Sequence, residues 1–314
     1  MANDTEPKPG VLGFLGGGKE GAAGEATGWQ RLSIILAVAL VTVALGWFGL
    51  RQERWNVVNM ADFRVCPAQV DLTGIAWLDG EAFRKDLLSR DKNKVLGKSY
   101  SILEKDLAKR VAQAYEQSPW VRHVRVVNKE FPNRLRIQLE LRKPFAAIEL
   151  AGRPVLVDQE GVVLDPKIFH MPANGMGQPP VKLAYLAPQP QIGAAWKQAD
   201  TGVAMALEML EYMAEKKEVF QRLGVRAVEV RREGLLPGQR RDLVVLKTVS
   251  GADIWWGGSP YNQVAGASAE VAPGVKLRRL DAVLNNPTEG LAIFEYIDVR
   301  WDRPTAKKRA TSAA

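Results

Sequence analysis

One uncharged, apolar run limits what this chain can fold into more than any other feature. From Leu32 to Leu50 the sequence reads LSIILAVALVTVALGWFGL, and its two hydroxyl side chains, Ser33 and Thr42, can bond back to a helix backbone. The hydrocarbon core of a bilayer is about 30 Å thick and is crossed by a helix of about 20 apolar residues. We therefore expect a transmembrane helix over residues 32–50.

The residues around this run favour an anchor over two alternatives, a buried core helix and a cleaved signal peptide. A signal peptide has an apolar run of about 7–15 residues and small residues at its cleavage site. Here the run ends with Trp47 and Phe48 and is followed by Arg51. Tryptophan suits both membrane interfaces, as at Trp29, Trp47 and Trp55. Positive charges do not orient the helix, because three stand on each side: Lys8, Lys19 and Arg31 before it, and Arg51, Arg54 and Arg64 after it.

Residues 1–31 before the run are predicted to be a disordered tail, because they are rich in Gly, Ala and Pro and hold few bulky apolar groups. Within them GFLGGGKE (13–20) matches the start of a phosphate-binding P-loop. Glu20 stands where Ser or Thr would hold magnesium, and no strand precedes the match. We interpret it as tail composition and not as a nucleotide site.

The whole chain has the composition of a globular protein, with 314 residues, 46% hydrophobic and 25% charged. Its formal net charge of +8 is concentrated in residues 64–144, which hold 17 basic and 10 acidic groups. Such a module could meet anionic lipid or nucleic acid, although a solvated face is the commoner meaning. One cysteine, Cys66, forms neither an intrachain disulfide nor a cysteine-built metal site, and His123 and His170 are a small supply for imidazole catalysis.

The first module after the span, residues 63–143, reads as strand, helix, helix, strand, strand. A connector (51–62) leads to a strand (63–74) and then to a helix (77–90) for which Asp79 is the expected N-cap. Ser101 and Glu104 have the spacing of a capping box for a second helix (102–117), which Pro119 ends. The two helices are expected to cover one face of a small sheet.

A basic ribbon closes this module at residues 118–144. Aliphatic residues alternate strictly with polar ones over 134–142, which predicts a half-buried strand, and Val124 and Val126 suit the strand opposite. Phe131, Pro132 and Asn133 form the turn. The exposed face would carry Arg122, Arg125, Arg134 and Arg136. A nucleic-acid role is disfavoured, because stacking aromatics are missing among these cations.

The second module, residues 144–301, reads as strands with one long helix. Strands are predicted on both sides of the Ala151-Gly152 turn and over 225–232, 242–249, 252–258 and 291–301. An amphipathic helix is predicted over 201–222 and a short helix over 276–286. Residues 302–314 are expected to form a flexible basic tail. The chain as a whole is therefore predicted to be α+β, with a mostly antiparallel, bent sheet in this module.

Several short motifs, in this order, resemble the bacterial cell-division proteins FtsQ and DivIB, and the first module resembles their POTRA domain. These motifs are Val70, Leu72 and Gly74; Pro119-Trp120-Val121; Phe131-Pro132; Arg142-Lys143-Pro144; Val157-Asp158 with Gly161; Lys276-Leu277 through Leu284; and Tyr296 to Arg300. The resemblance covers residues 32–301. It implies a cytoplasmic N-terminus, a single span in the bacterial inner membrane, and residues 51–314 on the periplasmic or wall side at the division site.

The resemblance also implies a function without catalysis or cofactor. Members of the family are scaffolds that bind two small bitopic partners, FtsB and FtsL, by adding a partner strand to the C-terminal sheet edge. Carried onto this sequence, the contacts would be Phe294, Tyr296, Arg300 and Trp301. The family continues this strand through a glycine turn into another short strand. Here DRPTAKKRA follows Trp301, and Pro304 cannot donate a ladder bond, so we expect a shortened or differently built edge.

Two other functions fit parts of the sequence. A POTRA-bearing secretion or envelope-assembly component would usually carry several such units and a barrel, and this chain has too few strands for one. A membrane-anchored wall-modifying enzyme would need a catalytic set, yet neither H-E-x-x-H nor G-x-S-x-G occurs. Asp158 and Asp165 flank a predicted hairpin, where Asp most often serves the turn.

Overall fold

A computed structural model describes residues 28–68, 75–172, 175–188, 190–234, 241–261, 270–286 and 290–310. The chain divides into two compact units, Met1–Asn59 and Met60–Ala314. The P-loop-like stretch at 13–20 and the Val70, Leu72 and Gly74 motif lie outside the described residues.

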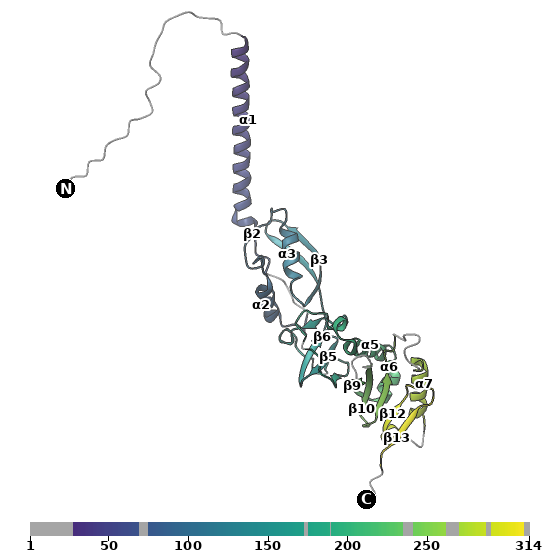
Figure 1. Ribbon diagram of the computed structural model, residues 1–314. Coiled ribbons are helices and arrows are strands. Elements are labelled where there is room, and N and C mark those ends of the chain that lie inside the picture. The colour runs from purple at the N-terminus through teal and green to yellow at the C-terminus, as the bar shows by residue number, and fades with distance from the viewer. Residues whose placement is uncertain are drawn as a thin grey trace, which may run out of the picture. The chain divides into compact units, whose positions relative to one another are not determined.

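The first unit contains helix α1, Gly28–Asn59 (Figure 1). Its segment Leu32–Glu53 has a mean hydropathy of 2.3 and is not buried, so it is long and apolar enough to cross a membrane. Thr42 Oγ1 donates to the carbonyl oxygens of Val38 (2.7 Å) and Ala39 (3.0 Å), as predicted for a hydroxyl in an apolar helix. The expected connector at 51–62 differs, because the helix continues to Asn59 before the short 3-10 turn Ala61–Phe63.

Residues 60–143, the N-terminal module, hold two helices and four strands among the described residues. The helices are α2 (Gly80–Arg90) and α3 (Leu107–Tyr115), and the strands are β1 (Arg64–Val65), β2 (Tyr100–Ser101), β3 (Val121–Glu130) and β4 (Arg134–Leu141). Asp79 caps α2 as predicted, accepting bonds from the backbone N–H groups of Glu81 and Ala82, both at 3.0 Å.

The predicted capping box at Ser101 and Glu104 is wrong. Ser101 lies in β2, and Glu104 forms an ion pair with Arg110 on the first turns of α3. The helix begins only at Leu107, five residues later than expected, because residues 100–101 pair with β1 and are held in an extended conformation.

The basic ribbon forms the predicted hairpin of β3 and β4. Leu135, Ile137 and the other aliphatic residues of β4 pack against the module's core. On β3 the register shifts twice, between Val121 and His123 and between Val124 and Val126. Val124 and Val126 lie in the strand opposite β4, as predicted, but the shifts place Val127 against the core, whereas Val126 pairs with Gln138.

The arrangement of strands in this module also differs from the single small sheet expected. Among the described residues, β1 pairs with β2, and β3 with β4, as two separate two-stranded sheets. Their shared core includes Phe83, Leu107, Val111 and Trp120. Leu156, Leu164 and Ile168, which follow the expected boundary at residue 143, pack into the same core.

Residues 144–310, the C-terminal module, are built on a nine-stranded mixed sheet. Its order is β13-β12-β11-β10-β9-β8-β5-β6-β7. The strands are β5 (Ala146–Leu150), β6 (Arg153–Val157), β7 (Val163–Leu164), β8 (Val181–Leu183), β9 (Val225–Glu233), β10 (Arg241–Thr248), β11 (Asp253–Gly257), β12 (Phe294–Asp298) and β13 (Thr305–Lys308). The pairs β5–β8, β8–β9 and β11–β12 are parallel, and the remaining five are antiparallel. Ala151 and Gly152 have positive φ, as the predicted two-residue turn requires.

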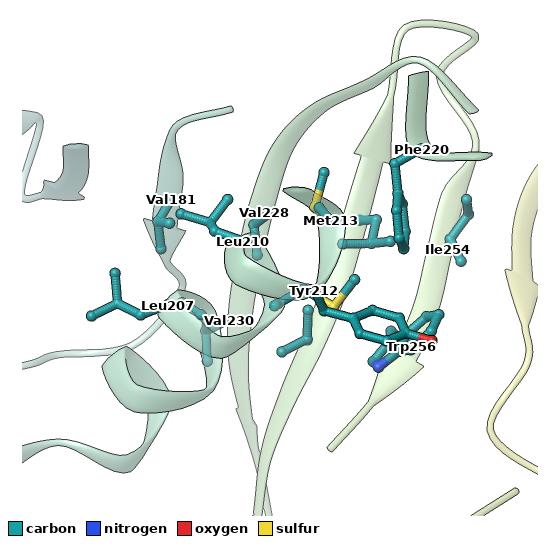
Figure 2. Packing of buried hydrophobic residues seen from close by; sticks show 14 of the residues in the cluster. Val181, Leu207, Leu210, Tyr212, Met213, Phe220, Val228, Val230, Ile254 and Trp256 are labelled. Carbon is teal, nitrogen blue, oxygen red and sulfur yellow. The ribbon is translucent and has the colours of Figure 1, made fainter. Parts of the chain in front are cut away.

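The long predicted helix packs on this sheet in two pieces, α5 (Thr201–Glu215) and α6 (Lys217–Leu223). Asp200 caps α5 through bonds from the N–H groups of Gly202 (2.9 Å) and Val203 (3.2 Å). The predicted stripe is buried, and Figure 2 shows Leu207, Leu210 and Met213 among side chains of the strands. Burial of each such side chain contributes about 1.5–3 kcal/mol.

Candidate partner-binding edge

The C-terminal edge of the large sheet differs from the one expected from the sequence. Helix α7 (Pro273–Leu284) and the 3-10 turn Leu291–Ile293 lead into β12, which pairs parallel with β11. Residues 305–308, expected in a flexible tail, form β13 and pair antiparallel with β12. Pro304 immediately precedes β13, so its missing N–H removes no ladder bond. The terminal strand of the sheet is therefore β13, whose four side chains are exposed.

Backbone direction decides what this edge can bind. Arg309 N donates to Ile293 O (2.8 Å), and Val299 N donates to Trp255 O (3.3 Å) on the other side of β12. Because alternate residues of a strand point the same way, Thr305 and Lys307 bond toward β12. Ala306 therefore directs its N–H and C=O to the outer side of β13, where another strand could pair.

The four predicted contact residues lie in different environments. Phe294 is 8% exposed and belongs to the core. Side chains alternate between the two faces of a strand, so half of them face inward in a strand with one buried face. Tyr296 is partly buried and stacks on Trp255, with ring centroids 5.1 Å apart. Trp301 is 37% exposed and offers the largest accessible apolar surface of the four.

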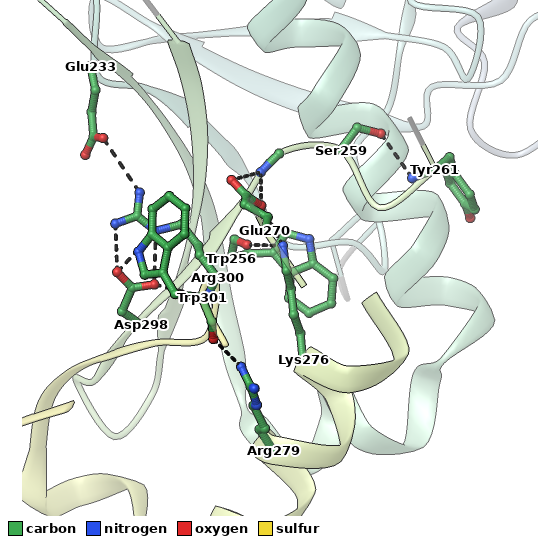
Figure 3. A network of polar contacts seen from close by, with 11 residues as sticks. Glu233, Trp256, Ser259, Tyr261, Glu270, Lys276, Arg279, Asp298, Arg300 and Trp301 are labelled. Atoms are coloured by element: carbon green, nitrogen blue, oxygen red, sulfur yellow. Dashed lines mark hydrogen bonds and ion pairs between the residues drawn. The ribbon is translucent and has the colours of Figure 1, made fainter. Parts of the chain in front are cut away.

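Arg300 is the fourth residue, and it organises the strand end more than it contacts solvent. Its side chain is 11% exposed and forms an ion pair with Asp298 (2.7 Å) (Figure 3). Its guanidinium carbon lies 5.1 Å from the Trp255 ring and 5.2 Å from the Trp301 ring. The hydrogen bond to Asp298 raises the pKa of Arg300, so its guanidinium stays charged. Arg300 thus fixes both tryptophans beside the edge.

The backbone carbonyl groups of Arg300, Trp301 and Asp302 are also held by hydrogen bonds. Arg279 on α7 donates to Trp301 O (2.5 Å) and Asp302 O (2.7 Å), and Val271 N donates to Arg300 O (2.7 Å). The loop between β12 and β13 is therefore braced by the late helix, which keeps the exposed indole in a defined position (Figure 3).

A buried lysine supports the same region. Lys276 on α7 is 3% exposed in its side chain and donates from Nζ to Trp256 O and Glu270 Oε2, both at 2.7 Å. Burial lowers the pKa of Lys276, because the charged form loses its hydration. Figure 3 shows this pair linking α7 to the end of β11. The sequence analysis placed Lys276 in a short predicted helix but did not indicate that its side chain is buried.

The basic ribbon is partly neutralised by carboxylates of the hairpin and by Glu160. Arg122 pairs with Glu140 (3.1 Å) and Glu160, and Arg125 pairs with Glu140 (2.9 Å). Arg136 pairs with Glu130 (2.9 Å). Of the four predicted surface arginines, Arg134 has no ion pair within the described part of the chain. The ribbon is thus not a uniform cation patch.

A second arginine joins the ribbon to the C-terminal module. Arg142 donates to Asp158 Oδ2 and Glu160 Oε2, both at 2.6 Å, and its side chain is 16% exposed. The bond from Arg142 lowers the pKa of Glu160. These contacts border an open depression of about 640 Å³ whose lining also includes Lys143 and Lys197.

The residues considered for catalysis hold local structure. Asp158 accepts from Val162 N (2.7 Å) and Asp165 accepts from Lys167 N (3.0 Å). His123 lies 3.3 Å from Glu116, and His170 lies 3.8 Å from Asp79. No cluster of three metal-ligating side chains occurs over the residues that the structure describes.

In comparisons with known proteins, no family model and no curated protein matches the chain.

Proposed function

We propose that this chain is a non-enzymatic, membrane-anchored scaffold of the bacterial division machinery, akin to FtsQ and DivIB. In this proposal α1 spans the inner membrane and residues 60–310 face the periplasm or wall side. The N-terminal module serves as a POTRA-type recruitment surface, and β13 accepts a strand from an FtsB- or FtsL-like partner.

The observation that carries the proposal is the outer side of β13. It is the terminal strand of a nine-stranded sheet, and its side chains are exposed. Such an edge presents unpaired backbone N–H and C=O groups, which are a template for another strand. Backbone bonds would supply affinity, and Trp301 beside the edge would supply an apolar contact.

A cell-biological experiment tests the proposed role. A fluorescent fusion of the full chain should gather at the division site in its host, and depletion should produce filaments. Uniform envelope distribution with normal division would contradict the scaffold function. Accumulation of misassembled outer-membrane proteins on depletion would instead favour a POTRA-bearing assembly component.

A binding experiment tests the edge. Trp301→Glu should abolish capture of an FtsB-like periplasmic segment while leaving the fold intact, because a charge replaces the exposed indole. Val249→Glu is the matched control, since Val249 is 74% exposed and follows β10. Equal binding by wild type and Trp301→Glu would exclude this residue from the interface.

A further inference from the structure

The turn of the β3–β4 hairpin exposes an aromatic side chain among cations. Phe131 is 65% exposed, and Lys129 and Arg134 stand on either side of the turn in the sequence. A single exposed apolar residue is ordinary on a protein surface. An exposed ring flanked by cations is, however, the combination that partitions into the headgroup region of a bilayer.

Contacts within the N-terminal module place this turn at the end where the chain enters the module. Ile102 N donates to Phe63 O (2.8 Å), directly after the 3-10 turn Ala61–Phe63. Lys129 Nζ donates to Glu104 O, which joins the hairpin to the same place. Two further apolar side chains are exposed here, Met60 at 48% and Leu103 at 36%.

The covalent chain keeps this end close to any membrane that holds α1. The apolar segment ends at Glu53, and α1 continues without interruption to Asn59. At 1.5 Å per residue, the helix from Glu53 to Asn59 adds only about 9 Å. A surface tethered so closely meets the bilayer at high effective concentration, so even a weak contact is populated.

The charges at this end favour anionic over zwitterionic lipid, although the excess is small. The cations are Arg64, Lys105, Lys129, Arg134, Arg136 and Arg110, and the acids are Asp62, Glu104, Asp106 and Glu130. Glu104 is paired with Arg110, and Glu130 with Arg136. Arg134, beside Phe131, has no ion pair among the described residues and is the cation best placed for a lipid phosphate.

We propose that the β3–β4 turn inserts Phe131 into the headgroup layer of the bilayer that holds α1, with Arg134 on an anionic headgroup. The N-terminal module would then rest on the membrane through two points, the span and the hairpin turn. This inference rests on the membrane anchor of the proposed function but not on the division role.

The test uses the full chain in lipid nanodiscs. Asn133→Cys, in a Cys66→Ser background, carries an environment-sensitive fluorophore at the turn, and lipids with shallow doxyl groups serve as quenchers. We expect quenching in discs of phosphatidylcholine with phosphatidylglycerol, and weaker quenching in phosphatidylcholine alone. Phe131→Ser should reduce the ratio of bound to free turn about tenfold, and Arg134→Glu should remove the preference for anionic lipid.

Leu186 supplies the matched control, because its side chain is fully exposed on the C-terminal module. A label at Leu186→Cys should not be quenched, and Leu186→Ser should leave quenching at the turn unchanged. Absence of quenching at position 133, or quenching unaffected by Phe131→Ser, would overturn the proposal. Failure of the span to insert, read from protease accessibility of the two ends, would overturn both the anchor and the turn contact.

Discussion

A proline placed at Ala306 should block the outer side of β13 without disturbing the sheet behind it. Ala306 directs its N–H away from β12, so Ala306→Pro removes no bond to that strand. An added partner strand would lose one backbone bond, worth about 1 kcal/mol, and would meet the pyrrolidine ring. We therefore expect binding of an FtsB-like segment to weaken by about tenfold or more.

Proline at the next position should behave differently. Lys307 pairs with Tyr296 and bonds toward β12, so Lys307→Pro breaks the ladder that holds β13 in the sheet. It should lower the free energy of unfolding by about 1 kcal/mol, whereas Ala306→Pro should change it by less than about 0.5 kcal/mol. Urea unfolding followed by tryptophan fluorescence separates the two variants.

The assay is biolayer interferometry with the partner's immobilised periplasmic segment. Ala306→Thr is the control, because it enlarges the side chain at the same position but keeps the N–H donor. If Ala306→Pro binds as tightly as the wild-type chain, the partner does not pair with the outer side of β13, and the edge mechanism is refuted.

Three further predictions concern the framework behind this edge. Asp200→Ala should destabilise the protein by about 1–2 kcal/mol in urea unfolding, because α5 loses its cap, whereas Asp165→Ala, which uncaps only a short 3-10 turn, should have a smaller effect. Arg142→Ala should lower the free energy of unfolding by about 2 kcal/mol, because it leaves the buried carboxylate of Asp158 without its ion pair; Arg122→Ala, at an exposed position, should leave the unfolding midpoint unchanged within error. The bond from Arg142 lowers the pKa of Glu160 below the ordinary glutamate value, so the stability from this contact should be present above that value and lost as the pH falls through the folded-state pKa. A pH series should show a smaller loss in Arg142→Ala than in the wild-type chain, because Arg122 also bonds to Glu160 and still lowers its pKa in the variant.

The local features predicted correctly from the sequence depend on neighbours along the chain. Thr42 bonds back within its own helix, Asp79 caps the helix that follows it, and Ala151-Gly152 forms the turn between adjacent strands. Each of these arrangements is decided by a few consecutive residues, whose side chains and dihedral preferences are readable in order.

Features set by distant segments were less predictable. Ser101 and Glu104 have the spacing of a capping box, but pairing of β2 with β1 draws Ser101 into a strand. The two register shifts in β3 exchange Val126 for Val127 on the core face, and alternation along one strand cannot reveal a bulge formed with its partner.

At the candidate partner-binding edge, too, some features are readable from the sequence and others are set by distant segments. The sequence alone determined that a long apolar helix precedes an α+β module, and that a strong strand lies near the C-terminus, because hydrophobic periodicity is a property of the chain itself. Only the tertiary structure decided that β13 covers β12, that Phe294 faces the core, and that Arg300 is engaged by Asp298. Strand order and burial depend on residues far apart in the sequence. The pairing of Asp298 with Arg300, only two residues apart, depends on the strand end that the sheet holds in place. The energies of these interactions exist only when the sheet has formed.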